Sequence, residues 1–388
     1  MSLASVRDQE VAVRLLRNML ARGRVPNGLL FWGPGGVGKR MCAVEFAKAI
    51  NCRQAASDAA ASRDAAASRD ACDQCLSCRK IQNANHPDVA FVAPLKKARI
   101  IDKDAIEAMN EMASLRPFES KWRVFIIQEA ERMGIAAQNK FLKTLEEPAG
   151  NSLFILISEK PDQLLPTIRS RCQRVRFGSL RPQTVKELLL QVRDLPDNLA
   201  DSIAAVSQGQ MSRALDLVDS DKRPIVLDIV QKLAAGADPL AVAEDFAGVL
   251  ATTRAQIEDA VKCEFEGPEN EVSRDDREEI KKQQVALAEM LIRRDIMEYL
   301  YLFETWCRDQ EVYTLTSDAK RVLNRDQIPR LKAAGDQPDA GNLDRRLAAI
   351  ERTRLYLERF LKEDRVFRDL FFVLAEDGPP RAHAHDGV

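Results

Sequence analysis

The chain lacks an excess of charge of either sign and lacks long apolar runs. Its 388 residues carry 58 Lys and Arg against 59 Asp and Glu, for a formal net charge of -1. A near-neutral chain does not hold nucleic acid by bulk positive charge, although a local basic face can still do so. The longest apolar runs, such as Leu153 to Ile157, fall far short of the roughly 20 residues of a membrane helix. The composition therefore excludes a membrane-spanning protein and a generally basic nucleic-acid binder.

The N-terminal residues lack the apolar stretch of a secretory signal. Met1 to Leu15 contain Arg7, Asp8, Glu10 and Arg14, so we expect the chain to stay in the cytoplasm, where cysteines remain reduced. Its 45% hydrophobic and 30% charged residues are typical of a soluble globular protein and exclude wholesale disorder. At roughly 100–200 residues per domain, the length predicts two or three domains.

Short apolar runs alternate with helical segments in the first half of the chain. The predicted strands are Leu29 to Trp32, Val89 to Ala93, Val124 to Ile127 and Leu153 to Ser158. The predicted helices are Val11 to Arg22, Lys39 to Ile50, Asp102 to Leu115 and Ala136 to Leu145. This alternation is typical of a parallel sheet covered by helices on both faces. We therefore expect an α/β domain that ends near Phe177.

The remainder of the chain lacks strand signals and is predicted to be helical. The helices expected there are Thr184 to Arg193, Asn198 to Ser207, Met211 to Val218 and longer ones from Pro239 onward. Glu264 to Glu279 is acidic and contains a Gly-Pro pair, which predicts an exposed loop. We expect Gly378 to Val388 to be disordered. The hexapeptide DAAASR occurs twice in succession from Asp58 to Arg69 and is interpreted as a tolerated surface insertion.

A glycine-rich loop follows the first predicted strand and precedes a predicted helix. In such a loop, backbone N–H groups surround phosphate oxygens, the helix N-terminus adds a favourable dipole, and a lysine supplies positive charge. This context favours a P-loop over a plain turn. The residues of the loop are Gly33, Pro34, Gly35, Gly36, Val37, Gly38 and Lys39.

Ligands for Mg²⁺ are lacking at both positions where a hydrolysing P-loop protein needs them. Lys39 is followed by Arg40 rather than Ser or Thr, and a guanidinium offers donors only. The strand Val124 to Ile127 leads to Gln128 and Glu129, where an ATPase places an Asp-Glu pair. Gln128 is a poor ligand for a hard cation, whereas Glu129 can still orient a water. We therefore expect no Mg²⁺ and negligible ATP hydrolysis, with the loop either holding ATP or ADP or serving only as structure.

Four of the eight cysteines gather between residues 52 and 78. Cys72, Cys75 and Cys78 have CxxCxxC spacing, and Cys52 lies upstream of them. Four thiolates form a closed tetrahedral zinc site, which has a folding role because no coordination position is open. An iron–sulfur cluster is disfavoured because the expected fourth cysteine and proline are missing after Cys78. The remaining cysteines are interpreted as small buried hydrophobes: Cys42, Cys172, Cys263 and Cys307.

An arginine-containing segment, Ile168 to Cys172, closes the α/β region. From such an edge Arg171 can reach a neighbouring subunit's γ-phosphate and stabilise the charge that develops in phosphoryl transfer. Composition alone favours the plainer interpretation that the arginines face solvent. His86 is followed by Pro87, which predicts a turn before the second strand.

Together these motifs resemble the bacterial clamp-loader subunits of the AAA+ class. The most specific parts of the resemblance are Asn139 to Pro148, which reads NKFLKTLEEP, and the Ser170-Arg171-Cys172 tripeptide. The other matching stretches are Gly28 to Lys39, the four clustered cysteines, His86-Pro87-Asp88 and Ser114 to Pro117. The resemblance is dense from about residue 9 to residue 180 and thinner beyond.

This resemblance implies an AAA+ P-loop α/β domain over residues 1–178, with a zinc module inserted at 52–78. A helical lid at 179–222 and an all-α collar at 223–376 follow, with the tail at 377–388. By resemblance, Arg171 acts in trans on the ATP of an adjacent motor subunit, and Ser158 stands at the first sensor position. Ser212 stands where a motor subunit carries its second sensor arginine, and Arg213 is displaced by one residue.

The altered positions Arg40, Gln128 and Ser212 fit a non-hydrolysing scaffold within the DNA polymerase III holoenzyme. The partners that the resemblance implies are the gamma/tau and delta subunits, the sliding clamp and primed DNA, all during DNA replication. An ATP-hydrolysing gamma/tau-type motor subunit is the first alternative. A zinc-stabilised adaptor unconnected with replication is the second, and it leaves Arg171 and the LKTLEEP run unexplained.

Overall fold

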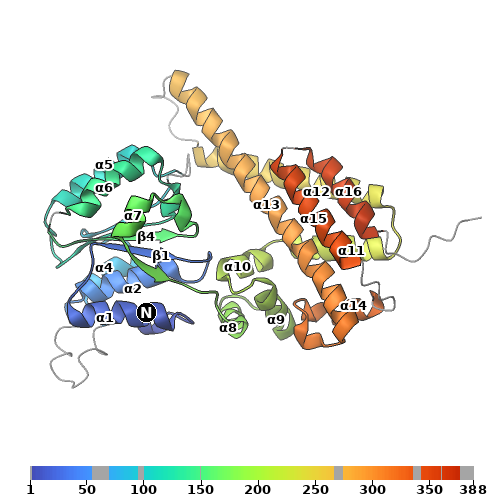
Figure 1. Ribbon diagram of the computed structural model, residues 1–388, viewed down its shortest axis with the longest axis horizontal. Helices are drawn as coiled ribbons and strands as arrows, with labels where there is room; N and C mark the ends of the chain where they lie inside the picture. The colour runs from blue at the N-terminus through green and yellow to red at the C-terminus, as the bar shows by residue number, and fades with distance from the viewer. Residues whose placement is uncertain are drawn as a thin grey trace, which may run out of the picture. The chain divides into compact units, whose positions relative to one another are not determined.

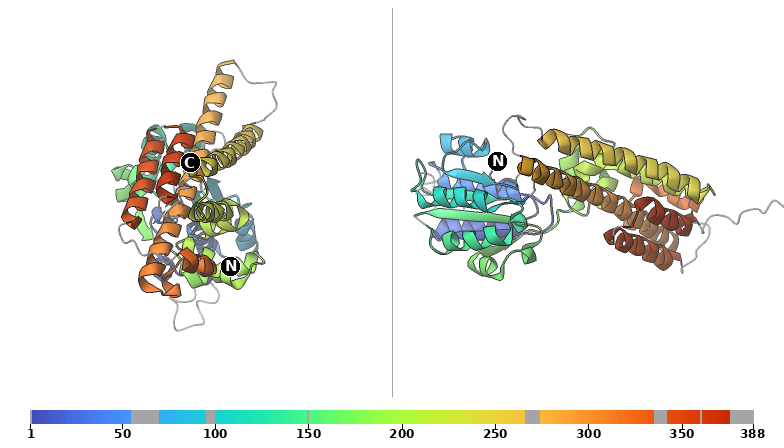
Figure 2. Two further views of the ribbon diagram at one scale, coloured as in Figure 1. Left: turned by 90° about the vertical axis from the view of Figure 1, so that its right-hand side faces the viewer. Right: turned by 90° about the horizontal axis from the view of Figure 1, so that it is seen from above.

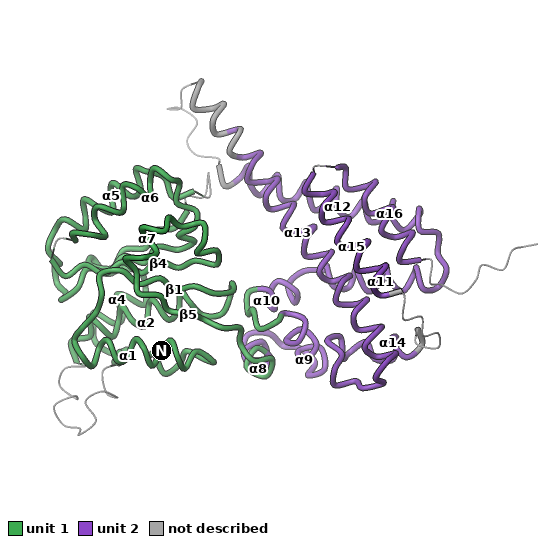
Figure 3. The backbone as a smooth tube through the Cα atoms, viewed as in Figure 1, with its two compact units in different colours: residues 1–185, 208–212 green, residues 186–207, 213–388 purple. Residues whose placement is uncertain are grey.

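The computed structural model describes residues 2–54, 70–94, 100–148, 150–265, 274–334, 342–359 and 361–375. The chain divides into two compact units, residues 1–185 with 208–212 and residues 186–207 with 213–388 (Figure 3). The three-part division into α/β domain, lid and collar stays a prediction. The repeated hexapeptide and the tail from residue 378 lie outside the described residues. Within the described ranges, no helix combines the length and the apolar character that a bilayer crossing requires.

A five-stranded parallel sheet forms the centre of the first unit, as predicted for the α/β class. Its order is β2-β3-β4-β1-β5. The strands are β1 (Gly28–Trp32), β2 (Val89–Val92), β3 (Arg123–Ile127), β4 (Ser152–Ser158) and β5 (Gln173–Arg176). Because all strands run the same way, the segments that follow β1, β3 and β4 meet at one edge of the sheet.

Helices cover both faces of this sheet (Figure 1). One face carries α1 (Glu10–Arg22), α2 (Lys39–Asn51) and α4 (Leu76–Gln82), and the other carries α5 (Lys103–Ser114), α6 (Ile135–Glu146) and α7 (Pro166–Arg171). Alternation along β4 explains the two cores: Leu153 and Ile155 pack on the first face, whereas Phe154 and Leu156 pack on the second.

The first unit has one strand more than the sequence predicts. β5 reads Gln-Arg-Val-Arg, and only Val175 among these residues is buried. The strand pairs with β1 alone and therefore lies at the edge of the sheet, where it needs no apolar run. For this reason β5 was not among the strands predicted from the sequence.

The second unit is helical. Its core joins Phe246 of α12 (Pro239–Phe265), Tyr299 of α13 (Arg274–Thr316) and Phe367 of α16 (Glu363–Ala375), with Phe246 ring centroids 5.1 Å from Tyr299 and 4.8 Å from Phe367. Helices α12 and α13 lie side by side (Figure 2). The other helices of this unit are α9 (Asp197–Val206), α11 (Lys222–Ala234), α14 (Ile328–Ala334) and α15 (Asn342–Glu358), while α8 (Pro182–Val192) and α10 (Met211–Asp219) contribute to both units.

Single 3-10 turns occur in both units, at Leu3–Ser5, Ala130–Arg132, Pro161–Gln163, Ala319–Arg321 and Arg325–Gln327.

The acidic segment at 264–279 is not a loop throughout. Residues 274–279 belong to α13, which begins at Arg274, and Phe265 still belongs to α12. Acidic side chains favour the first turn of a helix because they oppose its positive N-terminal dipole. A high charge density was therefore a poor indicator of a loop here.

Candidate functional site

The predicted P-loop lies between the end of β1 and the start of α2, as its sequence indicates. Gly33, Gly36 and Gly38 have φ angles of 145°, 67° and 92°, a range that residues with a Cβ rarely adopt. A Cβ at Gly33 would lie 2.2 Å from the carbonyl oxygen of Phe177. The glycines are thus required by the backbone, and the loop precedes a helix N-terminus that favours anions.

The ammonium group of Lys39 is bonded to the loop itself. Its Nζ donates to the carbonyl oxygen of Gly33 at 2.7 Å and to that of Pro34, and the residue is 6% exposed. Burial lowers the pKa of Lys39, while the nearby carboxylates of Glu159 and Glu131 act in the opposite direction. A phosphate would have to displace these two carbonyl contacts in order to bind the ammonium group.

The turn at 208–212 packs against the loop. The N–H of Met211 donates to the carbonyl oxygen of Gly36 at 3.2 Å, and a Cβ at Gly36 would lie 2.3 Å from Ser212 Oγ. Arg213 is engaged elsewhere, within the helical unit: its Nε lies 3.0 Å from Glu298 Oε1, and its guanidinium stacks 4.2 Å from the ring of Tyr301. Of the two residues predicted at the second sensor position, Ser212 and Arg213, only Ser212 lies at the loop.

The predicted metal and water positions are Arg40, Gln128 and Glu129, and the Glu129 carboxylate is paired with an arginine. Arg40 is exposed, with its guanidinium 5.9 Å from the centroid of Phe91. Gln128 is half-buried at the end of β3, and Glu129 Oε2 lies 3.6 Å from Arg132 Nε. A positive side chain and a neutral amide thus occupy the two positions predicted from the sequence for the Mg²⁺ ligands of a hydrolysing P-loop.

Sequence reasoning missed two carboxylates near the loop. A Cβ at Gly35 would lie 2.6 Å from Glu159 Oε1, and Glu131 Oε1 accepts the N–H of Glu159 at 3.1 Å. Both residues follow the ends of central strands, β4 and β3, and this position was the signal that could have identified them. Their negative charge lowers the attraction of the loop for phosphate.

Ser158, the predicted first sensor residue, ends β4 at the same edge of the sheet. It is 1% exposed, and its Oγ has no hydrogen-bond partner among the described residues. An unpaired buried hydroxyl costs about 1–3 kcal/mol, which a ligand or water oxygen would recover. The Ser158 hydroxyl is thus a buried polar group that the described side chains and backbone leave without a partner.

The four clustered cysteines come together as predicted. Their sulfur atoms all lie within 4.8 Å of one another, and Cys72 Sγ lies 4.0 Å from Cys78 Sγ. Thiolates around a tetrahedral zinc ion at 2.3 Å are about 3.8 Å apart. Cys52 caps the C-terminus of α2, and Cys75 caps the N-terminus of α4, so two helix ends position the ligands.

Backbone N–H groups support the thiolate form of Cys75. Although burial disfavours the charge, the N–H groups of Cys78 and Arg53 lower the pKa of Cys75 to about 7. Burial raises the pKa of Cys78, which is the most buried of the four. A zinc ion would supply the positive charge that holds all four sulfurs as thiolates.

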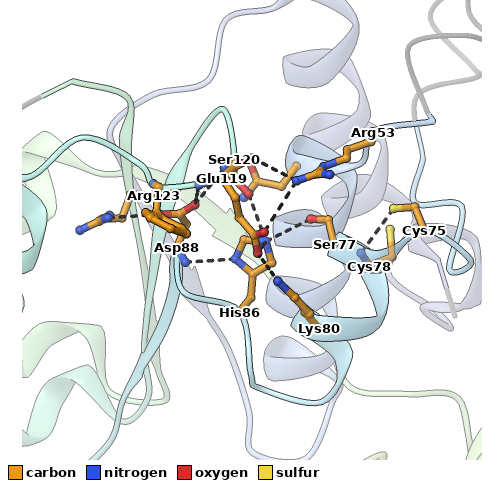
Figure 4. Close-up of polar contacts among 12 residues, drawn as sticks. Arg53, Cys75, Ser77, Cys78, Lys80, His86, Asp88, Glu119, Ser120 and Arg123 are labelled. Atoms are coloured by element: carbon orange, nitrogen blue, oxygen red, sulfur yellow. Dashed lines mark hydrogen bonds and ion pairs between the residues drawn. The ribbon is translucent and has the colours of Figure 1, made fainter.

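A buried histidine links this module to the loop after α5 (Figure 4). His86 Nε2 lies 3.2 Å from Ser77 Oγ and 3.1 Å from Ser120 Oγ, and its Nδ1 accepts the N–H of Asp88 at 3.0 Å. The acceptor role of Nδ1 places the ring proton on Nε2 in the neutral imidazole. The His-Pro turn predicted from the sequence is therefore a buried structural junction.

Asp88 completes this junction. It accepts the N–H groups of Phe118, Glu119 and Ser120 at 2.6, 2.8 and 2.9 Å, and it pairs with Arg123 at 3.1 Å (Figure 4). These contacts outweigh its burial and lower the pKa of Asp88. One buried carboxylate thus accepts three successive backbone N–H groups of residues 118–120.

We expect His86 to make the free energy of unfolding fall on acidification. Burial lowers the pKa of His86 below the ordinary value of 6.5, against the opposing effect of Glu119 and Asp88. Below pH 6.5 the histidine of the unfolded chain is protonated while that of the folded chain stays neutral. The free energy of unfolding is therefore greatest above pH 6.5, and at lower pH it decreases by up to about 1.4 kcal/mol per pH unit. Urea titrations of the wild type and His86→Gln between pH 8 and 5 measure this slope. Equal slopes in both proteins would contradict the assignment.

Arg171 lies near the N-terminal end of β1, whereas the P-loop follows the C-terminal end of that strand. It ends α7, and a Cβ at Gly28, the first residue of β1, would lie 3.4 Å from the Arg171 carbonyl oxygen. The P-loop begins only after the five residues of β1, a rise of about 16 Å. That separation exceeds the length of an arginine side chain. Arg171 therefore does not serve its own loop.

The comparisons with known proteins match 54–57% of the chain to curated relatives. Residues 8–181 match a family model described as "DNA polymerase III, delta subunit". The delta' subunit of Bacillus subtilis is 31% identical over 214 residues, which cover 55% of this chain and 60% of that protein. The delta' subunit of Pseudomonas aeruginosa is 31% identical over 229 residues, 57% of this chain and 66% of that protein.

The tau subunit of Bacillus subtilis DNA polymerase III is also 31% identical, over 54% of this chain and 36% of that protein. The chain thus spans less than two thirds of the length of each of these relatives. The resemblance to clamp-loader subunits seen in the sequence is confirmed.

Proposed function

On the premise that the chain is a DNA polymerase III delta-prime-like protein, we propose that it is a clamp-loader subunit that hydrolyses no ATP itself. Arg171 serves the ATP of an adjacent gamma/tau-type subunit, and the assembly loads the sliding clamp onto primed DNA. The observation that carries this proposal is the separation of Arg171 from the chain's own P-loop by the length of β1.

The electrostatics of the loop support the non-hydrolysing role. Hydrolysis needs a cation that bridges the phosphates and a carboxylate that holds it. Arg40 and Gln128 supply neither, and Lys39 is bonded to loop carbonyls. Ser212 adds no charge at the loop. Each of these features opposes phosphoryl transfer at this site.

Nucleotide binding without hydrolysis is the second part of the proposal. The backbone of Gly33 to Lys39, the Lys39 ammonium and the Ser158 hydroxyl would hold the phosphates of ATP or ADP. These groups supply binding and orientation, and they supply no Mg²⁺ ligand.

Zinc is the structural cofactor in this proposal. The four sulfurs of Cys52, Cys72, Cys75 and Cys78 fit its tetrahedral coordination, and the N–H contacts to Cys75 support a thiolate ligand. Zinc would join α2, the segment before α4 and α4 itself, which is a role in folding rather than in catalysis.

The proposed partners are the gamma/tau and delta subunits, with the helical region at 223–376 as the collar that joins them. The match to a tau subunit favours one alternative, a motor subunit of the same assembly. The substitutions Arg40, Gln128 and Ser212 argue against that alternative. A zinc-stabilised adaptor outside replication would leave the matches to delta' subunits without an explanation.

The purified chain should hydrolyse ATP no faster than a protein-free control in the presence of Mg²⁺. The reason is that neither metal position offers a ligand. Phosphate release assays measure the rate, and isothermal titration with ATP measures binding separately. Mg²⁺-dependent turnover that Lys39→Ala abolishes would identify a motor subunit and refute the proposal.

A further inference from the structure

The guanidinium of Arg171 is held by two contacts from different helices. Its Nη2 lies 2.5 Å from Glu146 Oε1, and its Nη1 donates to the carbonyl oxygen of Thr167 at 3.1 Å. Glu146 is the last residue of α6, and Arg171 is the last residue of α7. These helices pack against each other on the same face of the sheet.

The surroundings of this guanidinium are negative on both sides. The carbonyl oxygen of Thr167, the second residue of α7, carries partial negative charge and accepts directly from the guanidinium. Glu146 adds a full charge at the end of α6. A planar guanidinium with donors in a fixed fork keeps one orientation when two of its nitrogens are bound from different directions.

The pair is not buried. The side chains of Arg171 and Glu146 are 40% and 45% exposed, so the guanidinium remains accessible to another molecule. A half-exposed pair adds little to the free energy of unfolding. The pair is therefore better explained by orientation of the guanidinium than by stability.

We propose that Glu146 is a positioning residue that holds the Arg171 guanidinium ready for the phosphate of a neighbouring subunit. This inference rests on the proposed trans role of Arg171. An arginine that is already oriented loses less conformational freedom when it meets the transition state, and the rate gains accordingly. Glu146 touches no phosphate itself and acts only through Arg171.

The neighbouring residue offers a matched control. Glu147 follows Glu146 directly and is exposed, and among the described residues no hydrogen bond or ion pair joins it to Arg171. Glu146→Gln and Glu147→Gln remove the same charge one residue apart. Glu146→Ala additionally removes the acceptor oxygen that Arg171 uses.

The test is ATP turnover by a complex reconstituted from this chain with gamma/tau-type and delta-type subunits and primed DNA. Glu146→Ala should lower kcat at the adjoining site about tenfold and leave KM within twofold, because orientation matters in the transition state. Glu146→Gln, which keeps an acceptor oxygen, should lose about threefold or less. Glu147→Gln should match the wild type.

A second measurement follows the guanidinium directly in the isolated chain. In protein labelled with ¹⁵N-arginine, relaxation of the Arg171 Nε signal reports its mobility. Glu146→Ala should increase that mobility and leave the melting temperature unchanged, whereas Glu147→Gln should change neither. This readout is independent of assembly with other subunits.

The outcomes separate the two proposals. If Arg171→Ala abolishes turnover at the adjoining site but Glu146→Ala leaves or raises it, the positioning role is wrong and the trans role stands. If Arg171→Ala also has no effect, the proposed function itself fails. Unchanged Nε mobility in Glu146→Ala would overturn the positioning role whatever the turnover shows.

Discussion

Replacing Arg171 with alanine should lower ATP turnover at the adjoining motor site by a factor of about 10³ or more. The guanidinium neutralises charge on the phosphoryl group as it transfers, and no other group replaces it at that site. Single-turnover measurements on the reconstituted complex with primed DNA resolve the affected site. The steady-state rate of the whole complex falls less, because the other sites retain their own arginines.

Arg169→Ala is the matched control for this experiment. Arg169 lies on the same helix, its Nη1 is 2.6 Å from Asp162 Oδ1, and it is the less exposed of the two arginines. It should leave turnover at the adjoining site within twofold, since the trans role is proposed for Arg171 alone. Equal losses in both variants would indicate a general effect of the helix and not an arginine in trans.

Replacing Cys78 with serine should remove bound zinc and destabilise the α/β unit. Cys78 is buried on α4 and shares the cluster with Cys52 at the end of α2, so the ion would join two helices. A metal at a thousand times its dissociation constant stabilises the folded state by about 4 kcal/mol, and this is the expected loss in the free energy of unfolding. Elemental mass spectrometry and urea unfolding measure the two effects.

Cys263→Ser provides the control for the cysteine variant. Cys263 is exposed, contrary to its interpretation as a buried hydrophobe, and it lies outside the cluster. That variant should keep one zinc per chain and the wild-type unfolding curve. A Cys78→Ser protein that retains zinc, or a wild-type protein prepared without chelators that contains none, would contradict the metal site.

Local patterns in the sequence predicted those parts of the fold that depend on neighbouring residues. The apolar runs in the sequence predicted the buried strands β3 and β4. The P-loop glycines occupy positions that need positive φ angles. Edge strand β5 was missed because one buried residue, Val175, suffices there. The start of α13 was missed because its charges resemble those of a solvated loop.

Contacts between distant residues were beyond sequence reasoning. Ser212 meets Gly36 across 176 positions of the chain, and Glu146 meets Arg171 across 25 positions. The sequence placed Ser212 and Arg213 together as sensor-like residues, yet successive positions on a helix point about 100° apart. Only the fold shows that one faces the loop while the other binds Glu298.

The central claim is that this chain contributes an arginine to catalysis but no hydrolysis of its own. Its most direct test compares Lys39→Ala and Arg171→Ala in the same reconstituted complex, with DNA-stimulated ATP turnover at the adjoining site as the readout. We predict that Lys39→Ala stays within twofold of the wild type and that Arg171→Ala loses about 10³-fold. A complex that loses turnover with Lys39→Ala and keeps it with Arg171→Ala would contradict the claim.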